Sequence, residues 1–176
     1  MEFNKLIKER RSIRAYKDED VKKKDIETII KTTLLAPSWE NSETGRYYVA
    51  TSKEAKKIVY DCLPDFNKRA SKNSSYIITT FKKNISGTIN KNVFADKLKN
   101  SWGAYDLGLQ NSYLILKAKD LGYDTLIMGL RNEKVLRKYF NIPNDEIMMP
   151  VIAIGKKNKK ANLVKRKDIK EVLIIK

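Results

Sequence analysis

Apolar residues recur with helical spacing in five stretches of the chain, each bounded by residues that start or stop helices. We expect helices over residues 3–9, 22–35, 53–63, 103–121 and 133–142. The helix over 103–121 has the most regular pattern, because its apolar positions form one stripe and Gly122 follows at its C-terminal end. The stripe consists of Leu107, Leu114, Ile115, Ala118 and Leu121.

Four shorter segments are rich in β-branched and aromatic residues, which predicts strands over 46–51, 75–81, 123–128 and 147–154. Residues 82–100 are polar, rich in Lys and Asn, and lack a strong period, so we expect a mobile loop there with at most one helical turn. Two helices precede the first strand, and strands and helices mix afterwards. This order predicts an α+β fold with one central sheet. No GxGxxG motif supports a doubly wound dinucleotide fold.

The length of 176 residues suits one domain, which we expect to span residues 1–176. No apolar run approaches the roughly 18 residues of a membrane span, and the charged start MEFNKLIKER is unlike a signal peptide. Cys62 is the only cysteine, and its apolar surroundings predict a core thiol of a helix. These features favour a protein of the reducing cytoplasm, without membrane association.

The chain contains no histidine, which excludes Ser-His-Asp and Cys-His catalysis and the HExxH zinc site. A single cysteine also excludes a four-thiolate zinc site, and we expect no metal. The remaining side chains are poor redox groups. If the protein is an enzyme, a bound cofactor is the economical source of its chemistry.

The formal net charge of +16 raises the possibility of nucleic-acid binding. Only eight of the 37 basic residues are arginine, and the lysines are scattered along the chain. Lysine lacks the fork that reads a base or grips phosphate at two points. Nucleic-acid binding is therefore a minor alternative, whereas three arginines within residues 10–14 are a specific feature.

Three segments carry candidate chemistry. Residues 10–14, Arg-Arg-Ser-Ile-Arg, offer guanidiniums that suit phosphate oxygens. Residues 36–41, Ala-Pro-Ser-Trp-Glu-Asn, end a helix with short polar groups and a flat indole. Residues 124–132 form a strand-to-helix junction in which Gly129 allows a ligand to approach the backbone. Taken singly, each segment also fits an ordinary structural role: a solvated basic turn, a helix stop and a junction.

Taken together, the order and spacing of these segments resemble the nitroreductase family of FMN-dependent oxidoreductases. A Trp-x-x-x-Asp helix containing Gln-Asn, and then Leu-Gly-Tyr-Asp, complete the pattern. Residues 166–172, Arg-Lys-Asp-Ile-Lys-Glu-Val, are similar to the closing segment of the family. The resemblance extends from Phe3 to Val172.

The resemblance implies an α+β fold with a mostly antiparallel central sheet flanked by helices, in an entwined homodimer with FMN between the subunits. It implies hydride transfer from NADH or NADPH to a nitroaromatic, quinone or related acceptor by a ping-pong mechanism, with the flavin rather than a side chain as the catalytic group. The basic segment 156–176 would complete the dimer and the FMN site. The implied cofactor-binding residues are Arg10, Arg11, Ser12 and Arg14 with Arg166 at the phosphate and ribityl chain, Pro37, Ser38, Trp39 and Asn41 from the other subunit, and Met128 and Gly129 at flavin N5.

One segment departs from the family pattern. The family often continues Asn-x-Gln-Pro-Trp, but here Asn41 is followed by residues 42–46, Ser-Glu-Thr-Gly-Arg. This change favours an altered acceptor preference. It also keeps a second hypothesis open, in which the protein is a flavin store or redox sensor without efficient turnover.

Overall fold

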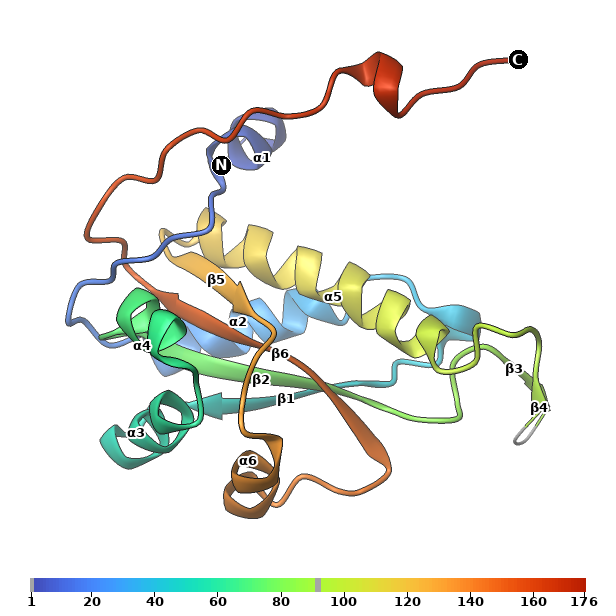
Figure 1. The fold of residues 1–176 in the computed structure, drawn as a ribbon, viewed down its shortest axis with the longest axis horizontal. Helices are drawn as coiled ribbons and strands as arrows, with labels where there is room; N and C mark the ends of the chain where they lie inside the picture. Colours follow the sequence, from blue (N-terminus) through green and yellow to red (C-terminus); the bar gives the residue numbers. More distant parts are fainter. Residues whose placement is uncertain (1, 91–92) are drawn as a thin grey trace.

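A four-stranded antiparallel sheet forms the centre of the computed structural model, which describes residues 2–90 and 93–176 (Figure 1). Its strands, in spatial order, are β1 (Gly45–Ala50), β2 (Ser75–Lys82), β6 (Glu146–Gly155) and β5 (Asp124–Met128). Each neighbouring pair is antiparallel. β2 and β6 occupy the middle, and seven of the eight residues of β2 are buried, which explains its continuous run of β-branched and aromatic residues.

Helices cover both faces of the sheet (Figure 1). α2 (Lys23–Thr33) and α5 (Ser101–Asp120) pack on one face, where Ile29, Ile77 and Leu114 lie in one apolar cluster. The second face carries α3 (Lys53–Asp61), α4 (Asp65–Ser71) and α6 (Glu133–Phe140). Its cluster contains Ile78, so neighbouring residues of β2 fill opposite cores, as the strand period of two requires.

The two terminal segments of the chain lie on the same side of this body (Figure 1). α1 (Phe3–Glu9) sits near the last turns of α5, and the segment after β6 runs past α1 and then extends away. This tail contains the short 3-10 helix η2 (Ile169–Glu171). Its apolar side chains are largely exposed; Ile174 and Ile175 each expose 84% of their surface.

The structure confirms the α+β class and the mostly antiparallel sheet flanked by helices. The predicted helices and strands are all present, with ends that shift by at most two residues. α5 begins earlier than expected, at Ser101, and Cys62 is buried as predicted. No helix in the described parts of the chain has the length and apolar character needed to cross a bilayer.

The prediction of an irregular loop over 82–100 is partly wrong. It contains a short hairpin, β3 (Thr88–Asn90) and β4 (Val93–Phe94), while residues 91–92 of the same stretch lie outside the described residues. Tertiary packing holds this hairpin: Gly87, at φ +81°, lies so close to Trp102 that a β-carbon would approach its indole ring to 2.5 Å. The local sequence pattern does not predict this contact.

One helix, α4, was not predicted. Its sequence, DFNKRAS, contains only two apolar residues, and Phe66 is 54% exposed. The buried residues of α4 are the polar Asn67 and Ser71. Hydrophobic periodicity therefore could not reveal this helix.

Gly103 is required by the packing of α5 on β2, because a β-carbon there would lie 2.4 Å from Cδ2 of the buried Phe81. We expect Gly103→Ala to lower the free energy of unfolding by about 1–3 kcal/mol through overpacking, measured by urea denaturation. Phe81→Leu is itself destabilising, but combined with Gly103→Ala it should cost less than the sum of the two single changes. If the two changes in the free energy of unfolding were strictly additive, this contact between Gly103 and Phe81 would be contradicted.

Candidate functional site

Backbone pairing places the arginine-rich segment 10–14 at the free edge of β5. Ser12 forms a parallel bridge with Thr125, and Ile13 donates its N–H to the Thr125 carbonyl at 3.0 Å. Tyr16 then pairs with Lys157, beyond the end of β6. Ile13 and Tyr16 are only 2% and 3% exposed. The burial of Ile13 directs its neighbours Ser12 and Arg14 outward, because side chains alternate along an extended chain, and both of these residues are exposed.

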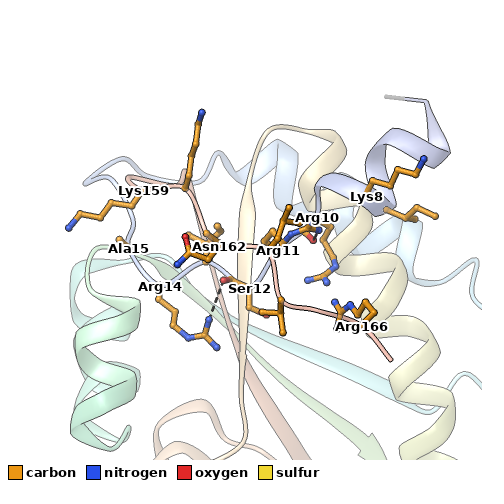
Figure 2. A pocket seen from close by; sticks show the side chains of 15 residues that line it. Lys8, Arg10, Arg11, Ser12, Arg14, Ala15, Lys159, Asn162 and Arg166 are labelled. Atoms are coloured by element: carbon orange, nitrogen blue, oxygen red, sulfur yellow. Dashed lines mark hydrogen bonds between the residues drawn. The ribbon is translucent and has the colours of Figure 1, made fainter. Parts of the chain in front are cut away.

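The outward side of this segment is one wall of a cleft of about 740 Å³, a size typical of small-molecule sites. The end of α1 and the chain after β6 supply the other walls (Figure 2). Seven lining residues are basic, and no acidic residue of the described chain lines the cleft. The basic residues are Lys8, Arg10, Arg11, Arg14, Lys159, Lys160 and Arg166.

The guanidiniums in this cleft interact unfavourably with one another. Burial lowers the pKa of Arg10, and the nearby charges of Arg11 and Arg166 lower it further. Arg11 also donates through Nη1 to the backbone carbonyl of Arg10 at 2.7 Å, which holds the Arg11 guanidinium against the backbone of its neighbour. A cluster of like charges without a lining carboxylate is a site for an anion with several oxygens, such as a phosphate.

The structure thus brings four predicted residues, Arg10, Arg11, Ser12 and Arg166, to one cleft. Arg14 lines the same cleft, but Figure 2 shows it on the other side of Ser12 from Arg10 and Arg166. Its Nη1 lies 3.4 Å from the Ser12 carbonyl. Arg14 is therefore placed beside the cluster rather than within it.

The predicted segment Pro37–Asn41 lies elsewhere, against the first turns of α5 (Figure 1). Trp39 donates its backbone N–H to Asp106 Oδ2 at 3.1 Å, and its indole packs on that of Trp102 with ring centres 5.0 Å apart. Ser38 Oγ accepts a hydrogen bond from the Glu43 N–H at 3.1 Å. The arginine cluster lies beyond the other end of α5, so one chain does not bring these two groups of residues together.

The third predicted element, Met128–Gly129, ends β5. Met128 is buried, whereas Gly129 is exposed, and a β-carbon built on Gly129 would meet no other atom within 4 Å. Open space therefore adjoins the backbone at this turn. These two residues do not line the basic cleft.

Several residues that line the cleft are not among the predicted site residues: Lys8, Lys159, Lys160 and Asn162. The first three were hidden among the many lysines of the chain. The run KKNKK at 156–160 marks the segment as basic, but no local pattern shows that it folds back beside residues 10–14.

Residues 7–156 match the model of the nitroreductase family. This chain belongs to that family. A relative from Archaeoglobus fulgidus, provisionally named as an NADH dehydrogenase/NAD(P)H nitroreductase, is 27% identical over 155 residues. The match covers 86% of this chain and 83% of the relative.

Solved structures of the nitroreductase family share the fold. A family protein from Streptococcus pneumoniae superimposes with a TM-score of 0.84 at 19% identity, covering 99% of this chain and 100% of that one. A provisionally named nitroreductase from Exiguobacterium sibiricum, solved in complex with FMN, gives a TM-score of 0.82 at 22% identity. That match covers 100% of this chain and 98% of the other.

The like-charge cluster predicts that removing one of its arginines does not destabilise the ligand-free protein. Arg10→Ala should keep or raise the free energy of unfolding, by up to about 1 kcal/mol, because it relieves repulsion from Arg11 and Arg166. Urea denaturation at low and high salt measures this, and salt should stabilise the wild type more than the variant. Lys134→Ala, at an exposed position of α6, is the control. A loss of stability above about 1 kcal/mol in Arg10→Ala would contradict net repulsion between Arg10 and its neighbours Arg11 and Arg166.

Proposed function

We propose that this protein is an FMN-dependent oxidoreductase of the nitroreductase family that takes hydride from NADH or NADPH and reduces a nitroaromatic, quinone or related organic acceptor. The observation that carries the proposal is the cleft in which Arg10, Arg11 and Arg166 converge without a lining carboxylate. The name of the archaeal relative and the FMN complex of the Exiguobacterium structure support it.

The residues present fit a flavin mononucleotide. Arg10, Arg11 and Arg166 would hold the phosphate, while Ser12 offers a hydroxyl and Arg14 a further guanidinium toward the ribityl chain. Charge-assisted hydrogen bonds from guanidiniums are the strongest that such a site can make to phosphate. Met128 and Gly129 lie at the open end of β5, where their backbone N–H groups would meet the ring.

When bound, FMN would supply the redox chemistry, the ping-pong transfer of hydride from NAD(P)H to the acceptor. The chain contains no histidine, so its own task is to bind and orient. Backbone N–H donors at the end of β5 would stabilise an electron-rich ring. The arginine cluster would fix the other end of the cofactor.

The site requires a second subunit. Pro37, Ser38, Trp39 and Asn41 lie at the far end of α5 from the arginine cluster, so they would complete the flavin site of the partner in a homodimer. The exposed apolar tail after residue 163 and the exposed Leu34 and Leu35 offer surfaces that a second copy would cover. We place this dimer in the cytoplasm and assign it no nucleic-acid partner.

Arg10→Ala tests the phosphate site. It should weaken FMN binding about ten- to a hundredfold, because one charge-assisted hydrogen bond is worth roughly 1.5–3 kcal/mol. Fluorescence titration of the ligand-free protein with FMN measures the affinity, and Lys134→Ala should bind as the wild type does. Unchanged affinity in Arg10→Ala would contradict the assignment.

A mixed dimer tests whether the site is shared between subunits. Arg10→Ala/Arg166→Ala chains and Asn41→Ala chains should each bind FMN poorly as homodimers. After unfolding and refolding together, about a quarter of all sites should recover full affinity, since half the dimers are mixed and each of those holds one intact site. No recovery in mixtures shown to contain mixed dimers would place both groups of residues in one subunit's site.

Turnover separates the enzyme from a flavin store or sensor, the alternative raised by the altered segment 42–46. In that segment Gly45 is tightly enclosed: a β-carbon would lie 2.0 Å from Gln110 Oε1, so no larger residue fits without rearrangement. We expect NADH or NADPH to bleach bound flavin in stopped-flow experiments, and steady reduction of a quinone or nitroaromatic to follow. Bleaching without turnover on any acceptor would favour the sensor.

A further inference from the structure

The turn that follows β5 is held by an arginine that is not among the predicted site residues. Arg131 donates through Nη1 to the Gly129 carbonyl and through Nη2 to the Met148 carbonyl of β6. Its side chain is only 16% exposed. One guanidinium thus ties the turn to the neighbouring strand at the point where β5 ends.

A second arginine nearby makes equivalent contacts away from the turn. Arg137 on α6 donates to the Pro143 carbonyl at 2.8 Å and to the Glu146 carbonyl at 2.7 Å, and its side chain is 22% exposed. Both arginines reach the same carboxylate, that of Glu133. The two side chains are therefore similarly buried, and each donates to two backbone carbonyls. Of the two, only Arg131 contacts the turn.

The charge of Arg131 is also less well compensated. Glu133 approaches Arg137 to 2.7 Å but Arg131 only to 3.5 Å. The Nε of Arg131 is buried without a hydrogen-bond partner among the described residues, whereas the Nε of Arg137 donates to Glu133 at 2.8 Å. Burial lowers the pKa of Arg131, and nearby Arg137 lowers it further while Glu133 opposes the change. A guanidinium nevertheless stays charged at neutral pH.

We propose that Arg131 is a positioning residue of the flavin site, which fixes the Met128–Gly129 turn and places a permanent positive charge beside it. This inference rests on the proposed function, because it takes the open side of the turn as the place of the flavin ring. Reduced flavin carries more negative charge than oxidised flavin, so a fixed cation nearby favours the reduced form. Arg131 should therefore raise the reduction potential of the bound cofactor.

The test compares Arg131→Met and Arg131→Gln with Arg131→Lys and with the matched control Arg137→Met, all as FMN-loaded protein. Three quantities are measured: the affinity for oxidised FMN, the midpoint potential by equilibration with a reference dye, and the stability in urea. The two neutral variants at 131 should bind reduced FMN about tenfold more weakly relative to oxidised FMN, a fall in potential of about 30 mV for a two-electron couple.

Arg131→Lys should hold the potential closer to the wild type, because it keeps the charge while losing one of the two carbonyl contacts. Arg137→Met should lose stability without moving the potential. Equal potentials in wild type and in both neutral variants at 131, or an equal fall in Arg137→Met, would overturn the inference while leaving FMN binding intact. A wild-type protein that binds no FMN would instead overturn the proposed function, and this inference with it.

Discussion

The site depends on the pairing of residues 12–17 with the edge of β5 and with the chain beyond β6. An exposed edge strand offers unpaired backbone groups, and here the N-terminal segment occupies them through the Ser12–Thr125 bridge and the hydrogen bond from Ile13. Burial of Ile13 and Tyr16 sets the register, and the Tyr16 hydroxyl returns to the Ile13 carbonyl at 3.0 Å. The same pairing brings the two ends of the chain together, so residues far apart in sequence share one cleft.

The cleft is electrostatically costly without a ligand. Asp124 is next to Thr125 in β5, but its carboxylate is paired with buried Lys119 at 3.0 Å and does not line the cleft. The guanidiniums of Arg10, Arg11 and Arg166 thus have no acidic partner among the residues that surround them there. Repulsion within such a site lowers the free energy of unfolding of the ligand-free protein, and a bound anion raises it again by relieving the repulsion. The fold supplies this stability elsewhere, in the two apolar cores on either side of β2.

Most of the fold was predictable because the central strands are continuous runs of apolar, β-branched and aromatic residues and α5 carries an apolar stripe. α4 and the β3–β4 hairpin were not, because their positions depend on buried polar groups and on Trp102 packing over Gly87. The arginine-rich segment can be recognised in the local sequence. Its proximity to Arg166 depends on sheet-edge pairing, and only the family resemblance predicted it. The role of Pro37–Asn41 was also predicted only by the family resemblance, because this segment lies apart from the arginine cluster within one chain. Arg131 gave no sequence signal, since one arginine after a strand has no distinctive pattern.

The central claim is that the arginine cleft holds FMN. The visible absorption spectrum of the purified protein, recorded after saturation with FMN, removal of the excess and heat release of the bound ligand, tests it most directly. The account predicts a yellow protein that releases close to one FMN per chain, since each chain contributes one cleft. A colourless protein that fails to retain added FMN would contradict the account and leave the cleft as a site for some other anion.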